Sequence, residues 1–444
     1  MRPRLGSLLA LALPMVLARA SQSLITFADA IQVKDLGPRA IAATSTGGLN
    51  VMAFVILPMG MAFIIQSFVA QLAGKDRTAD APRFAWYGLA IALFASLIAL
   101  SMLPLVGPAL SLTGYSPEVQ HSMTEYMQIR MLSVGAVVGV EALGNWFGGL
   151  GNTWMQMIAG LITMVTAVVL NALLIPKMGV NGAAVASAIA SWLGFVFIAI
   201  AFWPKRHGRG QLSRRELRRV IRFGLPNGIN WFLEFAAFQV FVNVVIAGLG
   251  DETVAALNVV LAVNSIAFMP AFGLSSAGAI LAGQAIGAGD KDRVWPSVKL
   301  TLAVTLAWMG LVTACYLLGS HVVLGWFAPA GAAGSRLVAL GTSMLLVSAM
   351  WQVFDGTGMT LSETLRAAGD TSWPAAARII LAWFVFVPSA YIVVRYTGGG
   401  ALGAMGCLVA YIALLAIALA IRFKSGAWRR IELIEPDLLR EVAG

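Results

Sequence analysis

Twelve long apolar stretches run through this sequence of 444 residues. Each has the length of about 20 residues that a helix needs to cross the hydrocarbon core of a bilayer. Because lipid offers the backbone no hydrogen-bond partners, continuous apolar runs of this kind must be helical. The predicted spans are 8–33, 45–72, 84–106, 122–143, 155–176, 181–203, 219–248, 255–285, 298–319, 338–363, 375–395 and 400–422.

The composition excludes a soluble globular protein. Apolar residues make up 59% of the chain and charged residues 11%, whereas soluble domains hold about 45–50% and about 25%. The only two cysteines, Cys315 and Cys407, lie in apolar runs and indicate no disulfide framework. The net charge is +10, but the basic segments lack the interleaved aromatic residues that are typical of nucleic-acid binding. We therefore expect no nucleic-acid partner.

The second half of the chain repeats the first at a nearly constant spacing. Pro14 recurs as Pro226, Gly37 as Gly250 and Pro58 as Pro270, and residues 70–74 recur loosely as 283–287. Half-chain repeats are how many membrane transporters are built. Six spans in each half give both halves the same orientation, so the repeats should be related by an axis along the membrane normal.

These patterns together predict an all-α integral membrane protein of about 12 transmembrane helices. Two six-helix lobes would be related by a pseudo-two-fold axis along the membrane normal. The expected organisation is an N-terminal lobe over 1–203, a basic cytoplasmic linker over 204–216, a C-terminal lobe over 217–424 and a cytoplasmic tail over 425–444.

Basic residues are concentrated on one side of the predicted membrane. They lie within 2–4, 75–83, 205–222, 291–299 and 422–440, whereas the opposite loops contain few. The positive-inside rule then places both termini in the cytoplasm of a bacterial inner-membrane protein. The first apolar stretch resembles a signal peptide with a cleavage site at 18–20. Because Pro14 has its counterpart at Pro226, we interpret this stretch as the first transmembrane helix.

Nearly all of the 20 acidic residues lie in loops or at the ends of the predicted spans, and the four that we single out are Asp29, Glu141, Glu234 and Asp355. An ionised carboxylate near the bilayer centre costs about 2.5–3.5 kcal/mol, so it marks a functional site by default. Glu141 lies near the end of its span, and we expect it at the membrane interface. The other three are candidate ligands for a coupling ion.

Polar residues share the helical faces of these three acids. Helical spacing places Gln22 and Thr26 on the face of Asp29, Asn227 and Asn230 on the face of Glu234, and Gln352 beside Asp355. We expect them to line a cavity.

Other charged residues also lie in apolar surroundings. Arg19 would either extend toward the cytoplasm or neutralise an acid, and Arg130 could pair with an acid across the bundle. Glu363 and Arg366 have the spacing of an ordinary pair on a helix surface.

Catalytic motifs are lacking. The three histidines are scattered over loops, no H-E-x-x-H sequence occurs, and residues 287–290 lack the lysine of a phosphate-binding loop. We therefore expect no enzyme, no cofactor and no metal beyond a possible Na+ at Glu234 and Asp355.

Ordered motifs along nearly the whole chain resemble the multidrug and toxic compound extrusion (MATE) transporters, in particular the NorM-like branch. In the first half these are Leu13-Pro14, Phe27-Ala28-Asp29-Ala30, Leu36-Gly37 and Ala42-Ala43. In the second half they are Gly224-Leu225-Pro226, Phe232-Leu233-Glu234, residues 255–258 and 283–290, Phe354-Asp355, residues 365–371 and Pro374.

The resemblance implies a two-lobe antiporter that exports organic, often cationic, compounds in exchange for Na+ or H+. It implies that Glu234 and Asp355 form a cation site in the C-terminal lobe and that Asp29 belongs to the N-terminal lobe. Asn171 matches a polar residue of that lobe's site, although Ala167 replaces its usual polar neighbour.

Further candidates for the cavity lining come from the second half. Trp351 stands where the family usually has a tyrosine, which removes a hydroxyl ligand, and Asn258 belongs to a matching motif. We expect a monomer in contact with membrane lipid and small organic substrates.

Two other classes stay open from the residues alone. A lipid-linked saccharide flippase of related architecture would need more cationic residues in its cavity, and here the membrane-embedded charges are mainly acidic. A membrane-embedded transferase would need acids or histidines gathered at the membrane edge, and none are evident.

Overall fold

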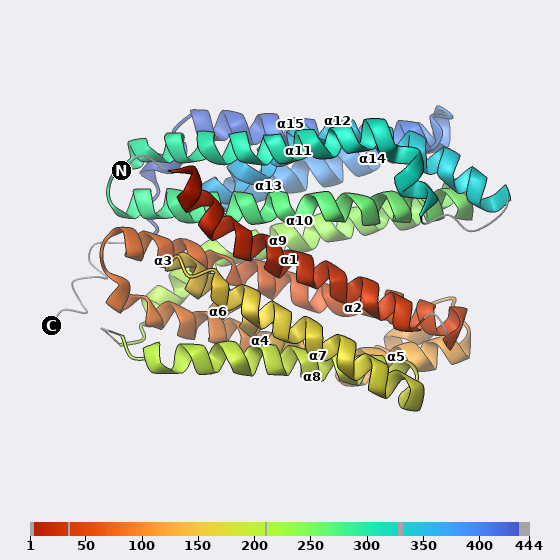
Figure 1. The fold of residues 1–444 in the computed structure, drawn as a ribbon, viewed down its shortest axis with the longest axis horizontal. Helices are drawn as coiled ribbons and strands as arrows, with labels where there is room; N and C mark the ends of the chain where they lie inside the picture. Colours follow the sequence, from red (N-terminus) through yellow and green to blue (C-terminus); the bar gives the residue numbers. More distant parts are fainter. Residues whose placement is uncertain (1–3, 34–35, 209–210, 327–331, 435–444) are drawn as a thin grey trace. The chain divides into compact units, whose positions relative to one another are not determined.

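The computed structural model describes residues 4–33, 36–208, 211–326 and 332–434. For residues 22–31, 38, 39, 42, 251, 332 and 333 it describes the backbone only. Every regular element within these ranges is a helix (Figure 1), which confirms the all-α prediction.

Fifteen α-helices follow one another along the described chain. They are α1 (Leu5–Val33), α2 (Pro38–Ala62), α3 (Ile64–Gly74), α4 (Pro82–Ser111), α5 (Pro117–Met131), α6 (Val134–Gly149), α7 (Trp154–Met178), α8 (Val180–Phe202), α9 (Arg214–Val240), α10 (Asp251–Gly287), α11 (Val294–Gly325), α12 (Ala332–Ala367), α13 (Ser372–Ile380), α14 (Val387–Tyr396) and α15 (Gly400–Lys424). Two π-helical segments, η4 (Phe241–Ile246) and η7 (Leu381–Phe386), follow α9 and α13. Short 3-10 turns are η2 (Thr78–Asp80), η3 (Trp203–Lys205), η5 (Ala247–Leu249), η6 (Lys291–Arg293) and η8 (Ala427–Arg430).

The predicted spans correspond to long apolar helices. Within the described residues, 10 segments are long and apolar enough to cross a membrane, and α5 with α6 adds one more if that pair, bent by 41°, is a single span. Helix α1 covers the first predicted span as one continuous helix of 29 residues. The chain is therefore a multi-pass membrane protein.

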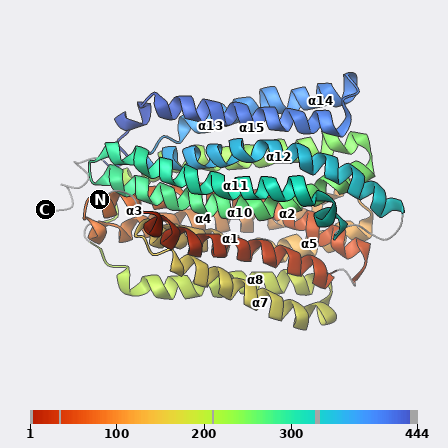
Figure 2. The ribbon, with the colours of Figure 1, turned by 45° about the horizontal axis from the view of Figure 1, so that its top comes forward.

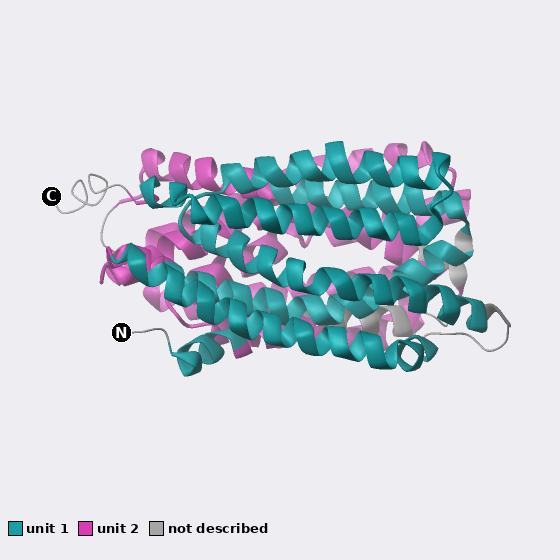
Figure 3. Cartoon of the chain, turned by 90° about the horizontal axis from the view of Figure 1, so that it is seen from above, with its two compact units in different colours: residues 1–12, 229–282, 290–432 teal, residues 13–228, 283–289, 433–444 magenta. Residues whose placement is uncertain are grey.

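The helices divide into two compact units (Figure 3). Unit 1 comprises residues 1–12, 229–282 and 290–432, and unit 2 comprises residues 13–228, 283–289 and 433–444. In unit 1, α12 packs against both α11 and α15. In unit 2, α7 lies beside α8, as Figures 1 and 2 both show, and α4 packs against α6. The predicted lobe boundaries at 203 and 217 stay a prediction.

Matched residues of the repeat adopt matched backbone conformations. Gly37 precedes α2 with φ 92°, and its counterpart Gly250 precedes α10 with φ 100°. Positive φ is strained for residues with a Cβ, so glycine is required at both positions. The duplication seen in the sequence is thus also present in the local backbone.

The ends of α3 and α10 meet through equivalent glycines within unit 2. A Cβ atom on Gly74 would lie 2.0 Å from the backbone oxygen of Gln284, and a Cβ atom on Gly287 would lie 2.0 Å from that of Gln71. The contact is reciprocal, because each glycine touches the repeat equivalent of its own neighbour. Two equivalent segments of the repeat are therefore in contact with each other within unit 2.

A buried ionic cluster fixes the start of α9 to α4 in unit 2. Arg83 pairs with Glu216 at 3.0 Å, and the Tyr87 hydroxyl donates to the other Glu216 oxygen at 2.8 Å. Arg83 and Glu216 are both buried. The end of the predicted linker is therefore held against the bundle.

Some residues in the described part of the predicted tail, 425–434, are buried against the helices, and others are exposed. Trp428 stacks on Phe423 in unit 1. In unit 2, Leu433 and Ile434 join the apolar core around Phe68, and Arg219 donates to the Leu433 carbonyl.

Candidate functional site

Glu234 on α9 is the centre of a polar cluster in unit 1. The Arg378 guanidinium on α13 donates to its Oε2 atom at 2.5 Å. The Tyr411 hydroxyl on α15 approaches its Oε1 atom at 3.5 Å. Three helices distant in sequence thus meet at one carboxylate, and its two oxygens have different partners.

Asp355 on α12 belongs to the same cluster. Its carboxylate interacts electrostatically with Glu234 and with Arg378, and its side chain is partly buried. No hydrogen bond to Asp355 is recorded among the described residues. The structure therefore brings together the two acids that the sequence singled out in the second half of the chain.

The π-helical segment η7 sets the geometry around this cluster. Its Trp383 donates to the backbone oxygen of Leu233, the residue before Glu234, at 3.0 Å. Its Phe386 stacks on Tyr411 with ring centres 5.2 Å apart. The segment η7 thus contacts the backbone beside Glu234 and the ring of Tyr411, and π-helical turns occur frequently at functional sites.

A network of side-chain hydrogen bonds joins α10 to α12 in the same unit. Gln352 donates to the Asn264 side chain at 2.8 Å, and Asn264 contacts the Ser348 hydroxyl at 3.2 Å. Gln352 is 1% exposed, so this predicted cavity residue is committed to an interhelical contact. Asn264 was not among the predicted site residues, although an amide in the middle of an apolar span is the signal that would have found it.

The remaining predicted polar residues of the second half do not form one group. Asn230 is buried, and its Oδ1 atom has no hydrogen-bond partner among the described residues. Asn227, in unit 2, donates to the Gly60 carbonyl at 2.6 Å. Trp351 is buried, whereas Asn258 is exposed.

In unit 2, Glu141 is buried in a polar contact, and its expected place at the membrane interface stays a prediction. Glu141 on α6 is 2% exposed and forms a two-pronged ion pair with Arg19 on α1, at 2.9 and 3.0 Å. Gln156 on α7 also donates to Glu141, at 3.3 Å. Position along a span predicts depth in the membrane, but the direction in which a helix face points decides burial. Of the two alternatives for Arg19, neutralising an acid is the one observed.

The prediction that Glu363 and Arg366 pair on a helix surface is wrong about the surface. The pair forms, with an N–O distance of 2.5 Å, but both residues are buried. For Arg130 no ion pair is recorded among the described residues, and its Nε atom is buried without a hydrogen bond.

The N-terminal site residues are described only in part. The side chains of Gln22, Thr26 and Asp29 lie outside the described residues, although the backbone of all three is helical within α1. Asn171 is fully buried on α7.

Arg378 and Tyr411 are the functional candidates that sequence reasoning missed. Arg378 is a cation inside the predicted span 375–395. An intramembrane charge of either sign indicates a functional site, so Arg378 could have been singled out in the same way as the acids. Tyr411 carried no signal, because a tyrosine in an apolar helix is ordinarily a packing residue.

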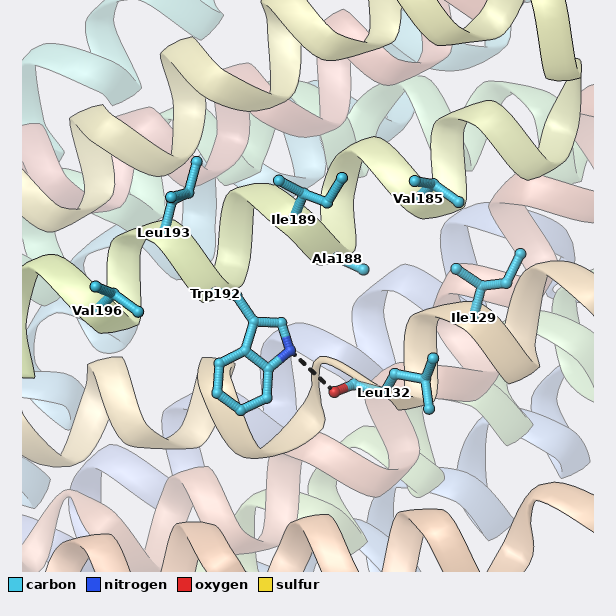
Figure 4. Close-up of a pocket in the computed structure, with 8 residues that line it drawn as sticks. All are labelled: Ile129, Leu132, Val185, Ala188, Ile189, Trp192, Leu193 and Val196. Carbon is cyan, nitrogen blue, oxygen red and sulfur yellow. Dashed lines mark hydrogen bonds between the residues drawn. The ribbon is translucent and has the colours of Figure 1, made fainter.

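An apolar pocket in unit 2 is lined by no charged side chain (Figure 4). It is formed by α5 and α8 and is lined by Ile129, Leu132, Val185, Ala188, Ile189, Trp192, Leu193 and Val196. Its polar contact is the Trp192 indole donating to the Leu132 carbonyl at 3.2 Å. Such a lining cannot bind an ion. Among the described residues no group of three or more His, Cys, Asp or Glu side chains could hold a metal ion either.

Comparison with known proteins identifies related chains over nearly the whole length. The MatE family model matches residues 14–173 and 229–392. The chain is 28% identical to the multidrug resistance protein NorM of Burkholderia vietnamiensis, with 93% of this chain and 92% of the relative covered. It is 26% identical to a probable multidrug resistance protein NorM of Pseudomonas putida, with 97% and 96% covered.

Solved structures share the fold at lower identity. A MATE crystal structure in complex with MaL6 has a TM-score of 0.89 at 23% identity, covering 96% of this chain and 97% of that one. A MOP superfamily transporter from Pyrococcus furiosus, described as having a binding pocket of reverse polarity, has a TM-score of 0.88 at 22% identity with the same coverage.

Proposed function

Because this chain belongs to the MatE family of membrane transporters, we propose that it is a secondary active antiporter. It exports drugs or other organic, often cationic, compounds in exchange for Na+ or H+ by alternating access. The observation that carries this proposal is the cluster of Glu234, Asp355 and Arg378 inside membrane-spanning helices. Relatives named multidrug resistance proteins support the class of substrate.

The chemistry of the proposed cycle follows from the carboxylates. A carboxylate in a low-dielectric site binds one cationic species at a time, so a coupling ion and a cationic substrate compete for it. Ion binding from outside favours return to the inward-open state, and substrate binding from inside favours the opposite change. Each ligand shifts the equilibrium only by its difference in affinity for the two states.

Residues of the first half of the chain bind substrate or a coupling ion in the N-terminal lobe. Asp29, with Gln22 and Thr26 on its helical face, binds substrate or a coupling ion, and Asn171 contributes to the same lobe. Two lobes, 1–203 and 217–424, rock about a site near the midplane. The protein acts as a monomer in the bacterial inner membrane, with both termini in the cytoplasm.

A saccharide flippase is disfavoured by the partners of two intramembrane arginines. Arg19 and Arg378 are both paired with carboxylates. Neither therefore offers a cationic surface to a pyrophosphate group.

Efflux of ethidium from cells tests the proposal. Asp355→Asn and Glu234→Gln are each expected to reduce efflux to that of cells without the protein, because each removes a charge on which the exchange of cations depends. The matched control is Glu252→Gln, since Glu252 is an exposed acid paired loosely with Arg336 at 3.5 Å. Efflux at the wild-type rate in both site variants would remove these acids from the mechanism.

A further inference from the structure

Arg378 is a permanent cation built into the proposed coupling site. Its guanidinium contacts Glu234 at 2.5 Å and interacts electrostatically with Asp355. The Glu234 side chain is 39% exposed and that of Arg378 15% exposed, so the pair is open on the side of the acid. The acid that a coupling cation would contact already has a positive partner.

Both carboxylate oxygens of Glu234 already have a hydrogen-bonding partner. One carboxylate oxygen accepts from Arg378, and the other faces the Tyr411 hydroxyl. A hard metal cation is bound by several oxygen atoms from carboxylates, carbonyls and water. Trp351 supplies no oxygen ligand, and the buried Gln352 side chain is held toward α10 by its Nε2 atom, which donates to the Asn264 side-chain oxygen. The residues present therefore do not fit a Na+ ion bound between the two acids.

The charge balance of the cluster favours a single additional cation. With both carboxylates ionised, the two acids and one guanidinium would carry one net negative charge. The ionisable groups facing Asp355 are Glu234 from α9, Arg378 from α13 and Tyr411 from α15. Near Asp355, the neighbouring helix α11 contributes the uncharged Thr305 and Met309, which pack against Gly356. A metal cation at Glu234 would add a second positive charge beside Arg378, and repulsion at this distance is strong in a low-dielectric site.

We propose that Arg378 takes the place of a metal cation at Glu234, so that this transporter excludes Na+ and leaves Asp355 as the carboxylate that exchanges cations. Arg378 is then a residue that determines ion specificity. The inference rests on the proposed antiport function and narrows its coupling ion.

Binding of radioactive Na+ to the purified full-length protein tests this directly. Wild type is expected to show no saturable Na+ binding, and Arg378→Met to gain it, because Glu234 then offers an uncompensated charge to the ion. Arg378→Lys keeps the charge and should bind no Na+. Arg395→Met is the matched control, since Arg395 is an exposed arginine at the end of α14. Elution of each variant as a single species on gel filtration establishes that it is folded, and Arg378→Gln replaces Arg378→Met if the latter is not.

Two results would overturn the inference. Saturable Na+ binding by wild type would show that Arg378 does not exclude the ion. Absence of binding in wild type and in the folded charge-removing variant alike would show that another feature excludes it. Neither result depends on transport. Failure of the wild-type protein to move ethidium in proteoliposomes under a pH gradient or a Na+ gradient would instead contradict the proposed function, whatever the binding experiment gives.

Discussion

Replacing Glu141 by glutamine is expected to lower the free energy of unfolding by about 3–5 kcal/mol. Glu141 and Arg19 have side chains that are 3% and 7% exposed, and they share two hydrogen bonds across 122 residues of sequence. Removing the carboxylate charge leaves the buried guanidinium without the counter-charge that the pair supplies. Because α1 also carries Asp29, the pair ties a predicted site helix to α6.

A double variant separates this explanation from a general intolerance of the position. Arg19→Met with Glu141→Leu replaces the pair by apolar groups and should recover most of the lost stability, since buried pairs are often replaceable in this way. Glu252→Gln, in an exposed pair with Arg336, should cost less than about 1 kcal/mol. Thermal unfolding in detergent measures all three. A Glu141→Gln protein as stable as the Glu252→Gln control would show that the pair of Arg19 and Glu141 does not stabilise the fold.

Replacing Gly74 or Gly287 by alanine is expected to destabilise the protein by roughly 1–3 kcal/mol, because the new Cβ atom meets backbone rather than a movable side chain. Each Cβ atom would lie 2.0 Å from a backbone oxygen of the opposite helix. The ends of α3 and α10 would therefore have to separate. The two sites share one contact, so the double variant should cost less than the sum of the two single changes.

Gly310→Ala provides the control for this pair of variants. Gly310 lies within α11, and a Cβ atom there would meet nothing within 4 Å. Alanine is the better helix former, so this change should leave the unfolding temperature unchanged or raise it. Single variants at Gly74 and Gly287 that unfold at the wild-type temperature would mean that the close contact is not maintained in the protein.

The acids of the site were predictable because their cost in lipid is independent of the rest of the fold. Glu234 and Asp355 stand out in any reading of apolar spans, and the structure brings them to one cluster. Their partners were not predictable in the same way. Arg378 and Tyr411 lie 144 and 177 residues from Glu234, and helical periodicity carries no information across such distances.

Errors in the sequence predictions have a common physical origin. Spacing placed Glu363 and Arg366 together, yet it could not tell that their shared face is buried. Position near a helix end gave no sign that Glu141 is buried against α1. Apolar length predicted which segments span the membrane, but not the 41° bend between α5 and α6 or the π-helical turn beside Arg378. Those features arise from packing between helices.

Ion-driven transport of ethidium in proteoliposomes decides whether the acids of unit 1 couple an ion to an organic cation. Wild type and Asp355→Asn would be reconstituted in equal amounts and given the same imposed ion gradient. Uphill ethidium movement is expected with wild type and none with Asp355→Asn, while Glu252→Gln behaves as wild type. Equal uphill movement with wild type and Asp355→Asn would show that Asp355 does not couple the ion to the organic cation.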